Sequence, residues 1–200
     1  MRLPGLIASR LVAALAITCL AVPFIEEPTT VGASGQPVDE AITEIDDYWT
    51  SQYAAGQYPY SAPDVVVGDK PADADCLAGD PVVYCESDGV IYVGESAVAA
   101  LDYDPSDIRT LTALAYAWGT WLTATWPDDM AGEEEAFAGC AAGVYIGHLW
   151  FDFATGEGDV MAAVDTVGSL ANTSRAQTDE RVLAFMTGFV VGFSGCIDLP

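Results

Sequence analysis

The β-forming segments of this chain are confined to residues 64–93, and the segments that follow have helical periodicity. Within that stretch, three short runs rich in Val, Ile and Tyr are predicted strands: 64–68, 82–85 and 90–93. Asp88-Gly89 separates the last two runs and predicts a β-hairpin. Apolar residues recur at helical spacing over 38–53, 107–126, 133–151, 159–170 and 178–193. This order predicts a single α+β domain, in which a short sheet packs on several helices.

The charge balance of the chain excludes several classes of partner. Thirty Asp and Glu against six Lys and Arg give a formal net charge of −24 over 200 residues. A nucleic-acid-binding protein needs clustered basic side chains for phosphate contact, so we predict no nucleic-acid partner. An anionic membrane would also repel this surface. A composition that is 52% apolar and 10% aromatic nevertheless predicts a folded core rather than an acidic disordered chain.

The first residues of the chain have the organisation of an export signal. Two arginines precede an unbroken apolar run over 11–22. The run is shorter than the roughly 20 residues that a membrane-spanning helix needs, and it suits the core of a signal peptide. We therefore predict a signal peptide or an uncleaved N-terminal membrane anchor over 1–33, a linker over 34–37 and one folded domain over 38–200.

An even number of cysteines remains when residues 1–33 are set aside: Cys76, Cys85, Cys140 and Cys196. An even set is typical of disulfide bonds in an oxidising compartment. Cys19, within the apolar run, leaves a lipoprotein anchor as an alternative. We therefore expect a secreted or extracytoplasmic protein, or one anchored to the outer face of the cytoplasmic membrane.

The single histidine, His148, is poorly placed to share a metal with the acidic residues of its own helix. It follows Glu135 by 13 residues, which is roughly 220° around a helix at about 100° per residue. The two side chains are therefore predicted on nearly opposite faces. We interpret His148 as a packed or half-exposed helix residue.

Three further features have a structural interpretation. The acidic run 128–135 lacks oxygen ligands at the third and fifth positions of a calcium loop; we interpret it as a solvated turn, with weak divalent-cation binding as the alternative. Gly188 and Gly192, four residues apart, predict close packing of the last helix against a neighbour. Four tryptophans are interpreted as core residues, and the alternative is an aromatic groove for a peptide or a sugar: Trp118, Trp121, Trp126 and Trp150.

Several short motifs follow one another in a recognisable order. They are Tyr48-Trp49, a cysteine pair that flanks 82–84, the hairpin residues Ile91-Tyr92, two core helices, and a tail with Gly188-Phe189, Gly192 and Cys196. This combination, over residues 38–200, resembles the bacterial neutral zinc metallopeptidase family, a zincin-like group. The resemblance implies a zincin-like fold for the single domain.

The catalytic motif of that family, HExGH, corresponds to residues 116–120 of this chain. In the family, the two histidines lie four residues apart on one helix face and bind zinc, and the glutamate between them is the general base. Here Tyr116 and Thr120 stand at the histidine positions, and Ala117 stands at the base position. Only Gly119 matches. The resemblance therefore implies a degenerate site with no catalytic residue and a lost zinc cofactor.

A second family segment, ExxADCxAG, is better matched. Its glutamate, the third zinc ligand, corresponds to Glu135, and Gly139 replaces its aspartate. The remaining matches are Ala138, Cys140, Ala142 and Gly143. A lone carboxylate does not hold zinc, so Glu135 is expected to be a vestigial ligand. We expect Tyr116, Thr120 and Glu135 to lie together, with the Tyr116 hydroxyl donating to Glu135 or Thr120.

The resemblance also implies two disulfide bonds, Cys76–Cys85 and Cys140–Cys196. A protein that keeps this frame without the zinc chemistry is expected to be an exported, inactive pseudo-metallopeptidase with a binding or scaffolding role. We expect a protein or peptide partner, with a basic one favoured by the charge, and membrane contact only through an uncleaved N-terminal segment. One alternative is an active divergent hydrolase with a site rebuilt around Tyr116, Glu135 and the acidic run. The other is an acidic module on an unrelated α+β fold that binds cations or a basic partner.

Overall fold

The computed structural model describes residues 37–56, 58–68, 76, 80–125, 134–153, 156–170 and 175–197. Residues 34–200 form one compact unit. The predicted signal or anchor over 1–33, and the linker apart from its last residue, lie outside the described residues. In the part of the chain that is described, no helix combines the length and apolarity that crossing a membrane requires.

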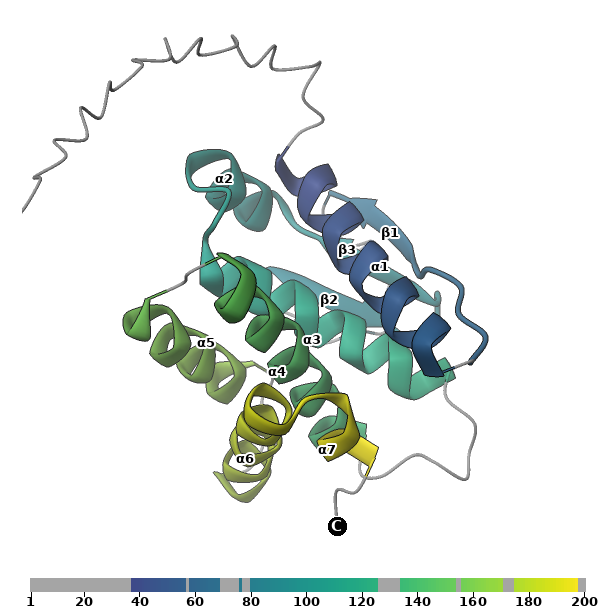
Figure 1. Ribbon diagram of the computed structural model, residues 1–200. Helices are drawn as coiled ribbons and strands as arrows, with labels where there is room; N and C mark the ends of the chain where they lie inside the picture. Colours follow the sequence, from purple (N-terminus) through teal and green to yellow (C-terminus); the bar gives the residue numbers. More distant parts are fainter. Residues whose placement is uncertain are drawn as a thin grey trace, which may run out of the picture. The chain divides into compact units, whose positions relative to one another are not determined.

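Seven helices and three strands make up the described fold, which is α+β (Figure 1). In chain order they are α1 (Pro37–Gly56), β1 (Asp64–Val67), β2 (Val82–Cys85), β3 (Val90–Val93), α2 (Glu95–Tyr103), α3 (Ile108–Thr125), α4 (Glu134–Phe153), α5 (Glu157–Ser169), α6 (Arg175–Val191) and α7 (Phe193–Ile197).

Helix α2 is the element that the sequence pattern does not predict. It is nine residues long, begins after Gly94 and buries only Ala97 and Leu101. Two buried positions in two and a half turns give almost no periodic signal. Asp104 ends the helix in an extended conformation, and its backbone N–H donates to the Ala100 carbonyl. The other predicted elements match the structure to within a few residues at each end.

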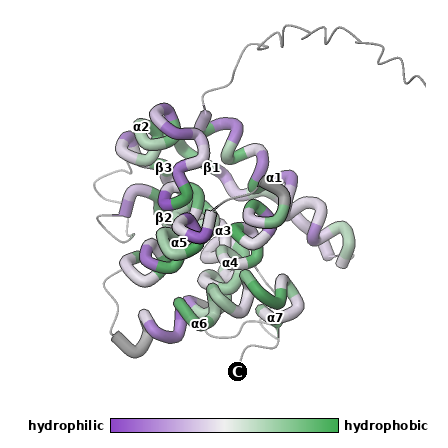
Figure 2. The backbone as a smooth tube through the Cα atoms, turned by 60° about the vertical axis from the view of Figure 1, so that its left-hand side comes forward, coloured by the Kyte–Doolittle hydropathy of each residue, from purple (hydrophilic) through white to green (hydrophobic). Residues whose placement is uncertain are grey.

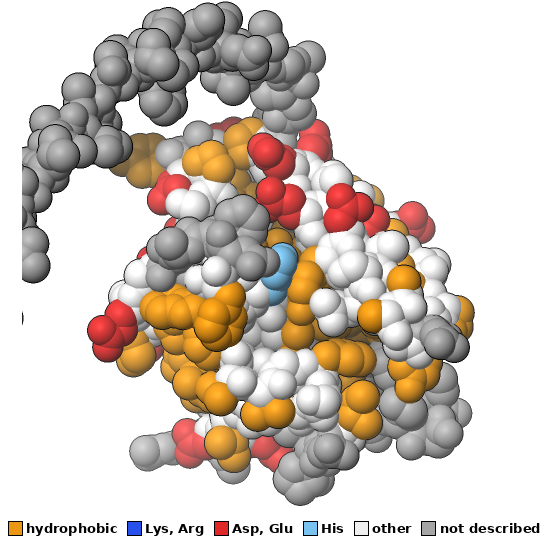
Figure 3. Space-filling view, in the orientation of Figure 1, with side chains coloured by type: hydrophobic (Ala, Val, Ile, Leu, Met, Phe, Trp, Pro, Cys, Tyr) orange, Lys and Arg blue, Asp and Glu red, His pale blue; other side chains and the backbone are white. Residues whose placement is uncertain are grey.

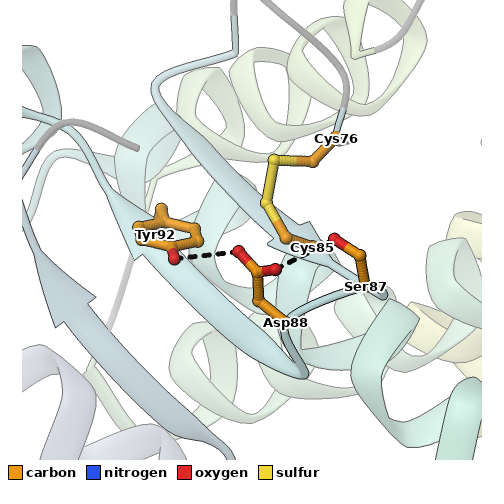
Figure 4. Close-up of a disulfide and its surroundings, with 5 residues drawn as sticks. All are labelled: Cys76, Cys85, Ser87, Asp88 and Tyr92. Atoms are coloured by element: carbon orange, nitrogen blue, oxygen red, sulfur yellow. Dashed lines mark hydrogen bonds between the residues drawn. A yellow bond between two sulfur atoms is a disulfide. The ribbon is translucent and has the colours of Figure 1, made fainter. Parts of the chain in front are cut away.

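The three strands form one sheet in the order β1-β3-β2. β2 and β3 are the predicted antiparallel hairpin, and Gly89 in its turn has a φ of 69°, which favours glycine. Asp88 closes the turn by accepting hydrogen bonds from Ser87 and Tyr92, and the neighbouring disulfide joins Cys76 to β2 (Figure 4). β1 pairs in parallel with β3, so that β2 is left at one edge of the sheet.

Helix α3 is the central element of the core. It contacts the sheet through β2 and β3, and it also contacts α4 and α5. Thirteen of its 18 residues are buried, including Trp118 and Trp121. Figure 2 shows hydrophobic segments along α3 and α4 and hydrophilic segments on α1 and α2. The interpretation of the tryptophans as core residues is therefore correct for these two; Trp150 is half-buried and Trp126 lies outside the described residues.

Glycines bring the backbones of α4 and α6 into direct contact. Gly139, Gly143 and Gly147 are four residues apart and lie on one face of α4. A Cβ atom at Gly143 would lie 1.9 Å from the Phe185 carbonyl oxygen, and one at Gly139 would lie 2.8 Å from that of Arg181. No larger side chain fits there without moving the helices apart.

The prediction for the two glycines of the last helix is half correct. Gly188 packs as expected, since a Cβ atom there would lie 2.0 Å from the Cys140 carbonyl oxygen. Gly192 does not pack against a neighbour: a Cβ atom there would meet nothing within 4 Å. Its φ of 80° instead ends α6 and turns the chain into α7.

Two disulfide bonds join distant parts of the fold. The structure pairs Cys76 with Cys85 and Cys140 with Cys196, as the resemblance implies. The first closes a short loop, with a sequence separation of 9, and the second spans 56 residues and ties α4 to α7. Chain-entropy estimates give about 3 and about 4 kcal/mol of stabilisation for loops of these lengths.

We predict that Gly188→Ala destabilises the protein, because the added methyl group overlaps the Cys140 carbonyl oxygen. The loss in unfolding free energy, measured by urea denaturation, should reach the upper end of the about 1–3 kcal/mol that overpacking usually costs. Gly158→Ala is the matched control, because α5 is open at that position. That variant should be neutral or more stable by about 0.5–1 kcal/mol. Equal stability of both variants would contradict the close contact of α4 and α6.

We predict that mass mapping of the unreduced protein recovers the peptides of Cys76 with Cys85 and of Cys140 with Cys196. The double change Cys140→Ala and Cys196→Ala should lower the unfolding free energy by about 4 kcal/mol, more than the about 3 kcal/mol expected for Cys76→Ala with Cys85→Ala. Any other pairing, or four free thiols, would refute both the frame and the inference of an oxidising compartment.

Candidate functional site

A cavity of about 210 Å³ lies between α3, α4 and the edge strand β2. Tyr116, Ala117 and Thr120 of α3 line it together with Glu135 of α4. The structure therefore brings together the residues that the sequence analysis selected. The remaining lining residues are Asp80, Val82, Val83, Tyr84, Ala138 and Leu170.

Helix geometry and helix packing position these side chains. Tyr116 and Thr120 are one turn apart, so they share a face of α3. Gly119 allows α4 to approach that helix, since a Cβ atom at Gly119 would lie 2.6 Å from the Ala138 carbonyl oxygen. Glu135 is in the first turn of α4, where a carboxylate is favoured by the helix dipole. The sequence thus places an acidic side chain at the mouth of a cavity whose walls are aromatic and apolar.

Arg181 of α6 is the functional group that the sequence analysis missed. Its side chain is 1% exposed, and its Nε atom lies 4.0 Å from Glu135 Oε2. The guanidinium carbon is 5.9 Å from the centroid of the Tyr116 ring, and the Nη1 atom donates a hydrogen bond to the Leu170 carbonyl. It is the single basic residue in the predicted helix 178–193. A lone arginine in an apolar helix is a signal of a buried ion pair.

Arg181 also changes how the Tyr116 side chain is used. Thr120 Oγ1 donates to the Tyr116 backbone carbonyl rather than receiving a bond from the hydroxyl. Burial raises the pKa of the Tyr116 hydroxyl, while a hydrogen bond and the charge of Arg181 act to lower it. The net pKa is raised, so the phenol is neutral at physiological pH and is not a nucleophile or a base.

Glu135 keeps hydrogen-bonding capacity for a ligand. Its side chain is 43% exposed, and its Oε2 atom accepts no hydrogen bond within the described part of the chain. Asp80 lines the same cavity and acts electrostatically on Tyr116. Two carboxylates at one mouth favour a cationic group, although the guanidinium of Arg181 offsets part of their charge.

The edge of the sheet adds backbone groups to the site. The Gly94 N–H donates to the Pro81 carbonyl, so the alternation of an antiparallel ladder turns the backbone groups of Val82 and Tyr84 away from β3. No strand among the described residues pairs with that edge. An extended peptide could form main-chain hydrogen bonds there while its side chains reach the cavity.

The other candidate residues lie elsewhere. His148 is half-buried and stacks on Tyr48 of α1, with ring centroids 4.6 Å apart. It lines a second hollow that shares no residue with the Tyr116 cavity. The acidic run lies outside the described residues up to residue 133. Across the described ranges, no three His, Cys, Asp or Glu side chains come together as a metal site.

We predict that Arg181→Lys lowers the unfolding free energy by about 1–3 kcal/mol, the cost of leaving a buried acceptor such as the Leu170 carbonyl unpaired. A lysine ammonium cannot at once bond that carbonyl, face Tyr116 and approach Glu135. Arg109→Lys is the control, because Arg109 is exposed, and it should change the value by less than about 0.5 kcal/mol. Urea denaturation measures both; equal values would refute the role of Arg181 as a buried anchor.

No family model, no curated protein and no solved structure matches this chain. The metallopeptidase resemblance therefore rests on the residue pattern and the order of the elements alone.

Proposed function

We propose that this chain is an exported, zincin-like pseudo-metallopeptidase that binds an extended, basic segment of a partner protein in the cavity beside β2. The observation that carries the proposal is the buried Arg181, whose guanidinium lies against Glu135 and Tyr116. Where the metallopeptidases place a metal beside the corresponding glutamate, this chain places the cation of a side chain.

The absence of catalysis follows from the groups that line the cavity. Tyr116 and Thr120 replace the two imidazole ligands, and Ala117 supplies no carboxylate that could act as a base. A zinc ion near Glu135 would also meet the positive charge of Arg181. General acid–base groups commonly contribute a factor of about 10²–10⁴ each to the rate, so peptide hydrolysis is expected at the background level.

Binding is supported by the groups that remain. Glu135 Oε2 has an unused lone pair, Asp80 lies at the same cavity, and the open edge of β2 offers main-chain donors and acceptors. The net charge of −24 adds long-range attraction for a basic partner. Export is supported by the two disulfide bonds and by the signal-like organisation of residues 1–33.

We predict saturable binding of a fluorescent peptide of alternating lysine and valine, measured by fluorescence polarisation. Glu135→Gln should weaken binding about tenfold, since a charge-assisted hydrogen bond contributes about 1.5–3 kcal/mol. Tyr84→Ala should weaken it as well, because Tyr84 lines the cavity from the edge strand. Glu157→Gln is the matched control, because Glu157 is an exposed acidic residue of α5; binding should be unchanged.

Equal loss in Glu135→Gln and Glu157→Gln would reduce the interaction to unspecific charge attraction and overturn the proposed site. A zinc measurement after gel filtration at high salt with a weak chelator tests the alternative of an active hydrolase. One retained zinc per chain, with chelator-sensitive proteolysis that Glu135→Ala abolishes, would replace the pseudoenzyme with that alternative.

A further inference from the structure

A second hollow, of about 360 Å³, opens between α1 and α4. Its volume is within the range of small-molecule sites, about 300–1,000 Å³. Glu44, Asp47 and Tyr48 of α1 line it together with Tyr145 and His148 of α4. In Figure 3 the single histidine, in pale blue, is visible between apolar side chains, with carboxylates above it and no basic side chain among those coloured on this face.

Aromatic rings form a fixed wall of the hollow. The His148 ring stacks on Tyr48 at a centroid distance of 4.6 Å and an interplanar angle of 22°. Tyr145 contacts Tyr48 edge-on, at 5.4 Å. Both helices thus contribute to one packed cluster, and the shape of the wall does not depend on a loop.

The Tyr145 hydroxyl indicates that the hollow is built for a polar ligand. Tyr145 is 1% exposed, and its Oη atom has no hydrogen-bond partner in the described part of the chain. A buried hydroxyl without a partner costs about 1–3 kcal/mol. The hydroxyl is near the acidic rim, since burial raises its pKa and Glu44 and Tyr48 raise it further. The neutral phenol is therefore an acceptor that a ligand with N–H groups would satisfy.

The rim carries unbalanced negative charge. Glu44 and Asp47 are three residues apart and lie on the same face of α1. Burial raises the pKa of the Glu44 carboxyl, the charge of Glu40 raises it further, and only His148 opposes this. A bound cation would relieve the repulsion. These side chains do not form a metal-binding group within the described residues, which favours an organic cation.

We propose that the hollow between α1 and α4 binds an alkylammonium group. Its three N–H donors would bond the carboxylates of Glu44 and Asp47 and the Oη atom of Tyr145, and its alkyl stem would lie along the Tyr48 and His148 rings. This site is independent of the proposed function, because its lining and that of the Tyr116 cavity have no residue in common.

The single histidine makes the test direct. In the full chain labelled at histidine with ¹³C, the imidazole gives one NMR signal, that of His148. Titration with butylammonium chloride in an amine-free buffer at fixed pH should shift this signal saturably. Glu44→Gln and Tyr145→Phe should each weaken binding about tenfold. Glu157→Gln and Glu135→Gln should leave it unchanged, and the second of these separates this site from the Tyr116 cavity.

Three controls make the proposal falsifiable. Sodium chloride at equal ionic strength, neutral n-pentanol and tetramethylammonium should give no saturable shift, because none of them offers ammonium N–H donors. A saturable shift by tetramethylammonium equal to that by butylammonium would overturn the proposed hydrogen bonds, and the absence of any butylammonium shift would overturn the site. N-acetyl-lysine amide is a second ligand. If it binds as tightly as butylammonium, the source is a lysine side chain, and if it binds tenfold more weakly, the source is a free amine; both outcomes support the site.

Discussion

The direct contact between the backbones of α4 and α6 is the constraint on which the rest of the structure depends. Gly139 and Gly143 on one helix and Gly188 on the other allow an approach that any side chain would prevent. The contact buries Cys140 beside α6 and sets where α7 delivers Cys196 for the disulfide. It also holds Arg181 at the inner end of the Tyr116 cavity. Packing at glycine therefore determines both the covalent frame and the electrostatics of the candidate site.

The positions that match the metallopeptidase pattern are packing positions in this structure. Gly119 contacts Ala138, Gly143 contacts Phe185, and Cys140 forms a disulfide. The positions that differ from the pattern, Tyr116 and Thr120, line the cavity. Gly139, which replaces an aspartate, is explained by the Arg181 carbonyl oxygen that lies against it. This division is what is expected of a fold that is retained while its chemistry changes.

Local patterns predicted most of the elements, because helical periodicity, Asp88-Gly89 and Pro127 act over short distances in sequence. Helix α2 was missed because it buries too few residues to leave a periodic trace. The parallel pairing of β1 with β3 depends on partners chosen across the sheet, which a local pattern does not encode. The cavity residues could be selected from a motif, but Arg181 lies far from them in sequence and is brought to Glu135 only by the packing of α6.

The glycine stripe of α4 has a consequence for helix register. Gly139, Gly143 and Gly147 lie in step against Arg181, Phe185 and Phe189, so the same spacing recurs on both helices. A slip of one helical turn, about 5.4 Å, would again set glycines opposite carbonyls and would cost little in backbone fit. Such a slip would place the apolar ring of Phe185 where Arg181 now lies. The Cys140–Cys196 bond admits only one of these alignments, so a covalent link at one end of the helix pair decides which side chain stands beside Glu135.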